Sequence, residues 1–253
     1  MWQSTVSLPL LSVLVLVAVR YWHHLGGFCR SVFSGGAGKG SGRRGAVQLT
    51  HSFVLMNSTH GQPDSVLQTF DLYAQTQPSL SIGKEKGEFV DCVVHRVAPT
   101  CALELGTHCG YTAIRILRRL PSSAKLYTVE QDPATAEAGE EMILVAGFKH
   151  SQFQMLISPS SAAIPRMRAE LGVRAVGLVL MDHDVEQYLP DLQALEQEGL
   201  VSTGSVLLVN NTHAQGARDF LRYIHSNPRY SVHSQRHGML EVQCQQGSID
   251  GTR

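Results

Sequence analysis

The residues Cys101–Tyr111 read C-A-L-E-L-G-T-H-C-G-Y, and this stretch decides the fold. An apolar run of strand length, Cys101–Leu105, leads directly into a turn that contains Gly106 and Gly110. A glycine turn between a buried strand and a helix is typical of α/β proteins that bind a ligand beyond the carboxyl ends of their strands. The stretch therefore predicts an α/β domain whose first strand ends in a ligand-binding loop.

The same alternation of strand and helix continues through the chain from about residue 48. Further buried strands are expected at Leu126–Glu130, Phe153–Ile157, Val176–Met181 and Val206–Asn210. Helices are expected at Ser65–Tyr73, Glu88–His95, Thr112–Leu120, Ala134–Ala146, Ala162–Leu171, Leu189–Glu198 and Gly216–Ile224. Buried strands joined by crossover helices predict a doubly wound, mostly parallel sheet that is covered on both faces.

Composition narrows the functional class. A chain of 253 residues with 43% hydrophobic residues suits one domain with additions. Lysine plus arginine (21) equals aspartate plus glutamate (21), so no overall field favours a nucleic-acid partner. The five cysteines are odd in number and include no C-x-x-C pair, which indicates neither a disulfide framework nor a zinc site.

The N-terminus has the features of a membrane anchor. No charge precedes Arg20, and about 19 uncharged residues are enough to span a bilayer. A cleaved signal peptide would need a positive region before the apolar run and small residues at a cleavage site after it, and R-Y-W-H-H follows instead. The basic residues follow the span, which puts the rest of the chain in the cytoplasm by the positive-inside rule. We therefore expect a single-pass anchor at residues 1–20.

A glycine-rich segment separates this anchor from the domain. Residues 34–45 read S-G-G-A-G-K-G-S-G-R-R-G, a composition typical of a flexible tether. A phosphate-binding loop is excluded, because no strand precedes the segment and no G-K-[ST] occurs in it. The expected organisation is an anchor at 1–20, a linker at 21–47 and a globular domain at 48–253.

Two features at the expected strand ends indicate the ligand. The turn after the first strand lacks G-x-G-x-x-G, so it is poorly suited to the pyrophosphate of a dinucleotide. Glu130 ends the second strand, roughly 20 positions beyond the turn, where an acidic residue can accept hydrogen bonds from ribose hydroxyls. Together they favour S-adenosylmethionine, a nucleoside ligand without phosphate, over NAD.

Several motifs resemble the catechol O-methyltransferase family in its membrane-anchored form, and the related transmembrane O-methyltransferases. They are L-E-L-G-T-H-C-G-Y-T, Y-T-V-E, L-V-L-M-D-H, Y-L-P-D and G-S-V-L-L-V-N-N, and the resemblance covers roughly residues 48 to 243. It implies the class I methyltransferase fold. By position, it implies that the methyl donor is bound by Ile82, Glu104, Gly106, Tyr111, Thr112, Glu130, Ser160, Asp182 and His183.

The resemblance also implies a metal and a substrate site. The family's Mg²⁺ ligands fall on Asp182, Asn210 and Asn211, and Asn210 stands where the family has aspartate. Loss of one carboxylate weakens the expected Mg²⁺ site, because this hard cation is held largely through carboxylates and waters. Glu241, in M-L-E-V, matches the glutamate that binds a catechol hydroxyl, and the family places it with Asn211 among the catalytic residues.

Other positions depart from the family. Val185 stands where the family has its general-base lysine, Pro78 and Asp184 replace tryptophans, and Gln215 replaces proline. The expected function is transfer of a methyl group from S-adenosylmethionine to a catechol hydroxyl, with impaired catalysis. The alternative is a membrane-anchored scaffold that keeps the fold without the chemistry.

The C-terminus raises a question about the sheet. In the family a last strand follows the glutamate matched by Glu241 and inserts into the sheet, whereas here the chain ends at G-S-I-D-G-T-R. A missing internal strand would leave unpaired backbone groups. Either the last strand is truncated, or Met239–Cys244 takes over part of its role.

Overall fold

The computed structural model describes residues 39–76 and 81–246, with side chains from residue 44. The chain divides into two compact units, Met1–Gly45 and Ala46–Arg253, and the fold below is that of the second. The anchor expected at residues 1–20 lies outside the described residues. Within the described ranges, no helix is long and apolar enough to cross a membrane.

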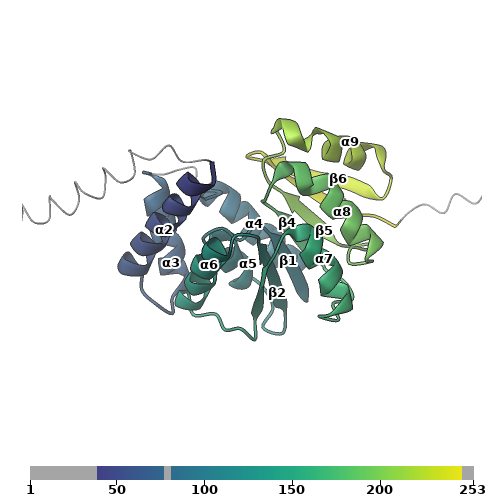
Figure 1. Ribbon diagram of the computed structural model, residues 1–253. Coiled ribbons are helices and arrows are strands. Elements are labelled where there is room, and N and C mark those ends of the chain that lie inside the picture. Colours follow the sequence, from purple (N-terminus) through teal and green to yellow (C-terminus); the bar gives the residue numbers. More distant parts are fainter. Residues whose placement is uncertain (1–38, 77–80, 247–253) are drawn as a thin grey trace, which may run out of the picture. The chain divides into compact units, whose positions relative to one another are not determined.

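The second unit alternates strands and helices as expected (Figure 1). The strands are β1 (Cys101–Leu105), β2 (Lys125–Glu130), β3 (Phe153–Ile157), β4 (Leu178–Met181), β5 (Val206–Val209), β6 (Tyr230–Arg236) and β7 (Met239–Cys244). The helices are α2 (Lys39–Asn57), α3 (Pro63–Ala74), α4 (Lys84–Val97), α5 (Tyr111–Leu117), α6 (Pro133–Val145), α7 (Ser160–Ala169), α8 (Tyr188–Gln197) and α9 (Arg218–Ser226). Short 3₁₀ turns, η2 (Val185–Gln187) and η3 (Gln215–Ala217), precede the last two helices.

The seven strands form one sheet in the order β3-β2-β1-β4-β5-β7-β6. Strands β1 to β5 pair in parallel, β7 is antiparallel to β5, and β6 is antiparallel to β7. The order reverses between β1 and β4, and in such sheets a ligand binds beyond the carboxyl ends at this switch point. The doubly wound, mostly parallel fold predicted from the sequence is confirmed.

Two hydrophobic clusters cover the two faces of the sheet (Figure 1). One cluster contains side chains of α2 to α6, among them Phe70, Val90 and Ile114, all buried. The other contains side chains of α7, α8 and α9, among them Ile164 and Tyr188. Both faces of the sheet are therefore packed against helices. A ligand can reach the sheet at the carboxyl ends of the strands, where polar groups lie.

The chain divides between Gly45 and Ala46, close to the expected boundary at residue 48, but part of the expected linker is helical. Helix α2 begins at Lys39, inside the glycine-rich stretch that was expected to be an unstructured linker, and Val47 and Val54 of this helix are buried in the core. Each glycine in a helix costs only about 1 kcal/mol relative to alanine. Burial of a valine side chain stabilises by a similar or larger amount, so tertiary packing outweighs the glycine content.

Of the two alternatives for the C-terminal part of the sheet, the structure supports the one in which Met239–Cys244 takes the place of the last strand. The strand that contains Glu241, β7, is itself inserted between β5 and β6, and its residues pair with β5 from Val206↔Gln243 to Val209↔Leu240. Hence Met239–Cys244 takes the inner position, and the strand expected after Glu241 is not needed to complete the pairing of β5. The hairpin turn that allows this insertion is at His237 and Gly238, both with positive φ.

Candidate functional site

The loop after β1 lies directly against the end of β4. Gly106 has φ +97°, and a Cβ at this position would lie 2.5 Å from the backbone oxygen of Asp182. Gly110 also has positive φ, and a Cβ there would lie 2.8 Å from the backbone oxygen of Gly139 in α6. Only glycine fits these two positions, and their close contacts fix the loop at the switch point of the sheet.

Glu130 is held ready to accept hydrogen bonds at the end of β2. Its carboxylate accepts from the backbone N–H of His108 (3.2 Å) and from that of Asp132 (3.1 Å), and the residue is buried. An ionised carboxylate has about four acceptor positions, so two remain for a ligand. Glu130 therefore lies where an acidic residue can bind the ribose hydroxyls of a nucleoside.

Glu104 is fully buried on β1 beside this position. Its Oε2 accepts a hydrogen bond from Thr128 (2.5 Å), and its Oε1 has no partner among the described residues. Burial raises the pKa of the Glu104 carboxyl to about 8, and the charges of Asp182 and Glu130 add to this, while the Thr128 hydrogen bond opposes it. An unpartnered buried carboxyl oxygen next to the glycine loop suits a polar or cationic part of a ligand.

Glu104 is expected to make stability depend on pH. Folding raises the pKa of this carboxyl from 4.5 to about 8. Its contribution is therefore fully present below the lower value and is lost as the pH rises through the upper one, with a slope of up to about 1.4 kcal/mol per pH unit. Urea unfolding across this range should show the decline in the wild type and a weaker one in Glu104→Gln. The exposed control Glu137→Gln should behave as wild type, and identical pH profiles for all three proteins would refute the prediction.

Asp182 and Asn210 meet where β4 and β5 end, as predicted. The Asn210 side-chain nitrogen donates to Asp182 Oδ1 (2.7 Å), and Lys86 Nζ donates to Asn210 Oδ1 (2.7 Å). The His108 ring Nε2 lies 3.0 Å from the Asp182 backbone oxygen. Burial raises the pKa of the Asp182 carboxyl, and His108, the Asn210 hydrogen bond, Lys86 and His183 oppose this increase. The cluster thus consists of the Asp182 carboxyl group, the Asn210 amide and the Lys86 ammonium group, which is bonded to that amide.

The geometry does not fit the Mg²⁺ site expected at Asp182, Asn210 and Asn211. Mg²⁺ takes oxygen ligands, but Asn210 turns its nitrogen toward Asp182 and its oxygen is bonded to Lys86. The third position, Asn211, has φ +52°. Within residues 39–76 and 81–246, no group of three or more His, Cys, Asp or Glu side chains could hold a metal ion.

His183 lies beside this cluster and is oriented by α8. Its Nε2 lies 2.6 Å from Asp191 Oδ2, and Asp191 is buried. The other ring nitrogen, Nδ1, is buried without a partner among the described residues. Sequence reasoning identified His183 but missed Asp191, which lies only eight residues further along the chain. It also missed Lys86, whose contact with Asn210 joins residues 124 positions apart.

The other predicted donor residues are placed as follows. The Tyr111 hydroxyl donates to Asp71 (2.6 Å) and accepts from Arg115 (2.7 Å). Thr112 is buried, Ile82 is half-buried against the core, and Ser160 is the first residue of α7. The structure therefore brings together Glu104, Gly106, Glu130, Asp182 and His183, while the hydroxyl of Tyr111 is used within the protein.

Glu241, expected to bind the substrate, has partners within the protein. It pairs with Leu208, which lies two residues before Asn210, and it is buried. Its carboxylate accepts hydrogen bonds from Arg96 of α4 and from Ser234 (2.9 Å). This carboxylate is therefore already engaged by a guanidinium group and a hydroxyl.

The positions that depart from the family have local partners. Val185 packs against η3, since a Cβ at Gly216 would lie 2.7 Å from its Cγ2. Asp184 is exposed, and its side chain accepts from the Glu186 N–H (3.1 Å) as the cap of η2. Gln215 begins η3 and is exposed, and Pro78 lies outside the described residues. No proton acceptor replaces the missing lysine at residue 185 itself.

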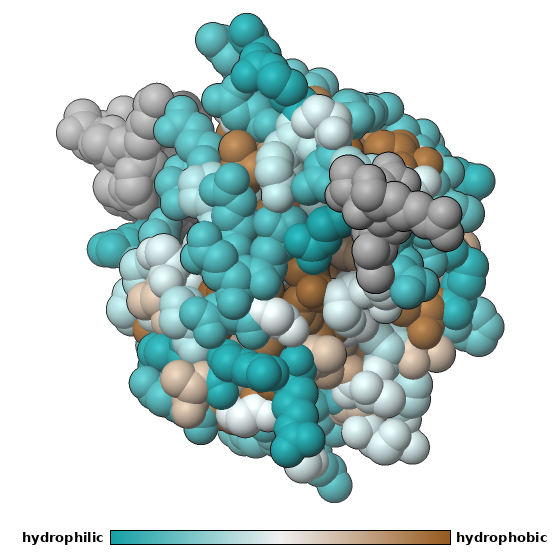
Figure 2. Space-filling view, turned by 90° about the vertical axis from the view of Figure 1, so that its right-hand side faces the viewer, coloured by the Kyte–Doolittle hydropathy of each residue, from teal (hydrophilic) through white to brown (hydrophobic). Residues whose placement is uncertain are grey.

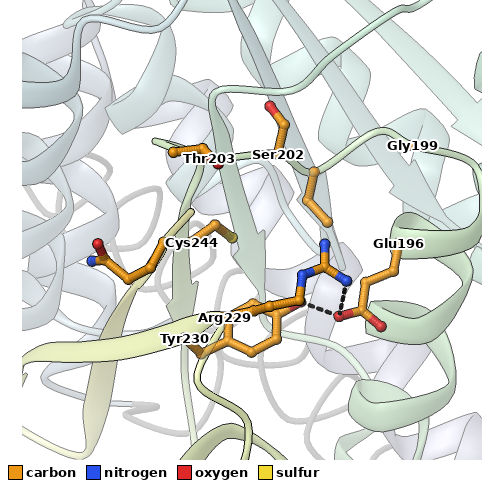
Figure 3. Close-up of a pocket in the computed structure, with 9 residues that line it drawn as sticks. Glu196, Gly199, Ser202, Thr203, Arg229, Tyr230 and Cys244 are labelled. Carbon is orange, nitrogen blue, oxygen red and sulfur yellow. Dashed lines mark hydrogen bonds and ion pairs between the residues drawn. The ribbon is translucent and has the colours of Figure 1, made fainter. Parts of the chain in front are cut away.

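A pocket of about 380 Å³ lies at the opposite end of the strands, near the start of β5 (Figure 3). It is lined by the loop before β5, the start of β6 and the end of β7. Glu196 projects toward Arg229 and Tyr230 there, and accepts from the hydroxyls of Tyr223 and Tyr230. The Glu196 carboxylate is thus already engaged within the protein. The pocket is also far from the carboxyl ends of the parallel strands, where ligands bind in this architecture.

Large hydrophobic side chains are exposed at only a few of the described positions. Figure 2 shows a face that is mainly hydrophilic, with hydrophobic residues confined to small areas. Among the described residues, the exposed large hydrophobic side chains are Met56, Leu72, Leu144, Ile157 and Val232. Scattered apolar residues of this kind are normal on a protein surface, so the polar cluster at the strand ends remains the candidate site.

The chain is similar in sequence to known proteins. The profile of the O-methyltransferase family matches residues 65–219. The chain is 35% identical over 226 residues to a transmembrane O-methyltransferase homolog of Mus musculus, covering 89% of this chain and 88% of that protein. It is 35% identical over 178 residues to the catechol O-methyltransferase of Bos taurus, covering 70% of this chain and 65% of that protein.

Solved structures show the same fold. An O-methyltransferase from Bacillus cereus in complex with SAH matches with a TM-score of 0.63 at 19% identity, over 78% of this chain and 90% of that one. An O-methyltransferase from Streptomyces achromogenes in complex with SAM matches with a TM-score of 0.63 at 18% identity, over 71% and 89% of the two chains. At such identity the likeness concerns the fold alone.

Proposed function

The chain belongs to the O-methyltransferase family, and we propose on that premise that it binds S-adenosylmethionine and methylates a catechol hydroxyl with impaired efficiency. When bound, the donor would supply a methyl group from its sulfonium sulfur. The C–S bond breaks as the bond to the hydroxyl oxygen forms, and the hydroxyl proton must pass to a base. The family resemblance, including 35% identity to a catechol O-methyltransferase, supports the substrate class.

One observation carries the donor assignment, namely the position of Glu130. It ends the strand next to the glycine loop, and two backbone N–H groups orient its carboxylate while leaving acceptor positions for ribose hydroxyls. Glu104 adds a buried carboxyl whose Oε1 lacks a partner among the described residues, on the adjacent strand. A donor with a sulfonium and an ammonium group is complementary to carboxyl groups at this edge.

A second function is favoured by the residues at the expected base, metal and substrate positions. Val185 offers no proton acceptor, the residues at 182, 210 and 211 do not fit Mg²⁺, and Glu241 is engaged with Arg96. A membrane-anchored scaffold that keeps the methyltransferase fold, with or without donor binding, would need none of these groups. No step of the proposed transfer is therefore assigned to a metal ion.

Isothermal titration of the full-length chain in detergent with S-adenosylmethionine, with and without Mg²⁺, separates the two functions. We expect one donor per chain with a dissociation constant well below about 1 mM, a binding free energy more favourable than about −4 kcal/mol. Transfer of a labelled methyl group to simple catechols then tests the enzyme. Absence of binding at millimolar donor would leave only the fold and favour the scaffold.

We propose in addition that residues 1–20 anchor the chain in a membrane, with the domain on the cytoplasmic side. The uncharged run before Arg20 supports this, and several relatives are named transmembrane O-methyltransferases. The full-length chain should resist alkaline extraction from membranes, and its first residue should be at or next to Met1. A mature N-terminus near residue 25 would show a cleaved signal peptide instead.

A further inference from the structure

Lys86 contacts one of the side chains that the family resemblance assigns to a metal ion. Its ammonium group donates to Asn210 Oδ1 at 2.7 Å, and the Asn210 amide connects it to Asp182 Oδ1 at 2.7 Å. Asp182 and Asn210 are both buried, and Lys86 is half-buried. A positive charge is thus already present among the side chains that were expected to bind Mg²⁺.

The direction of the two hydrogen bonds excludes Asn210 as a metal ligand in this arrangement. An ammonium group can only donate, so it must face the amide oxygen, and the amide nitrogen then faces the carboxylate, which can only accept. Turning the amide over would place donor against donor and acceptor against acceptor. Lys86 therefore fixes the orientation in which the amide oxygen is used and the nitrogen points toward Asp182.

The start of α4 holds Lys86 in this position. Gly83 precedes the helix with φ +81°, and a Cβ at Gly87 would lie only 2.5 Å from Arg115 Nε. Arg115 cannot move easily, because its side chain is 4% exposed and bonded to Asp91 at 2.7 Å. The first turn of α4 is thus packed closely on α5, and the lysine is held at the end of β5 rather than free in solvent.

Charge also opposes a divalent ion here. Sites for Mg²⁺ rely on one or two carboxylates with little competing positive charge, whereas Asp182 is the single carboxylate of this trio and the Lys86 ammonium is bound to its amide neighbour.

We propose that the Lys86 ammonium is the resident cation of this site and keeps divalent metal ions away from Asp182 and Asn210. Donor binding, and any methyl transfer, would then be indifferent to Mg²⁺ and to chelators. The inference goes beyond the proposed function, because it concerns ion binding whether or not the chain transfers methyl groups.

The test is Mn²⁺ binding to the full-length chain in detergent, measured by loss of the free Mn²⁺ electron paramagnetic resonance signal. The wild type is expected to bind no Mn²⁺ below about 1 mM. The double variant Lys86→Met/Asn210→Asp is expected to bind one Mn²⁺ at least about tenfold more tightly and to release it to excess Mg²⁺, because it gains a carboxylate and loses the competing charge. Lys84→Met, which removes an exposed lysine on the same helix, should behave as wild type.

Two outcomes would overturn the inference. One is stoichiometric Mn²⁺ binding by the wild type that Asp182→Asn abolishes, which would show that a metal ion displaces Lys86. The other is a double variant that unfolds at the wild-type temperature and still binds no Mn²⁺, which would show that Lys86 is not what excludes the ion. Lys86→Gln/Asn210→Asp provides a second variant should the methionine destabilise the fold.

Discussion

Replacing Glu130 by alanine is expected to weaken binding of S-adenosylmethionine by about 1.5 to 3 kcal/mol, the range for hydrogen bonds to a charged group. The structure explains why this one side chain should matter so much. The N–H groups of His108 and Asp132 hold the Glu130 carboxylate in place before any ligand arrives, so little ordering is required on binding. The measurement is isothermal titration of wild type and variant with the same donor.

The control for this result is Glu137→Ala. Glu137 is an exposed acidic residue on α6, and its removal changes net charge equally without touching the strand ends. Its donor affinity should equal that of the wild type. Because Glu130 also bonds the loop backbone, thermal unfolding of both variants is needed alongside. A folded Glu130→Ala variant with undiminished affinity would show that the ribose site lies elsewhere.

Much of the fold could be predicted because it depends on short-range pattern. The runs Cys101–Leu105 and Phe153–Ile157 were placed to the residue, since continuous apolar runs bounded by turns mark buried parallel strands. Glu130 was found for the same reason, since it ends such a run, whereas the resemblance to the catechol O-methyltransferase family supplied Glu104 and Asp182. Helix α2 was missed because glycine content in Lys39–Gly45 predicted a tether, whereas burial of Val47 is decided by tertiary contacts.

The contacts of the expected metal and substrate residues could not be predicted in the same way. Glu241 matched a local pattern, M-L-E-V, but its role depends on which strand lies beside β5, and register between antiparallel strands is not visible in a single segment. The hydrogen bond between Lys86 and Asn210 joins residues 124 positions apart. Nothing in the spacing of S-I-G-K-E-K-G distinguishes Lys86 from its neighbour Lys84, which is exposed and pairs with Glu88.

Turnover of simple catechols is expected to be at least about 10²-fold below that of a family enzyme with the lysine base, the lower end for loss of a general base. A phenolic hydroxyl has a pKa near 10 and is protonated at neutral pH, so its proton must be removed for transfer. Val185 cannot accept it. The neighbours do not replace it, because Asp184 is an exposed cap bonded to the Glu186 N–H and Glu186 is exposed as well.

The double change Val185→Lys with Asn210→Asp is expected to raise this turnover by at least about tenfold, part of the 10² to 10⁴ that a positioned base contributes. Val185 is only half-buried, so a longer side chain at this position can reach solvent. Glu186→Lys with Asn210→Asp is the matched control, since it adds a lysine one residue away on the exposed side of η2. Initial rates with a labelled methyl donor compare the variants. Wild-type turnover within tenfold of a family enzyme, or equal gains in both double variants, would mean that the missing lysine does not limit the reaction and that another group removes the proton.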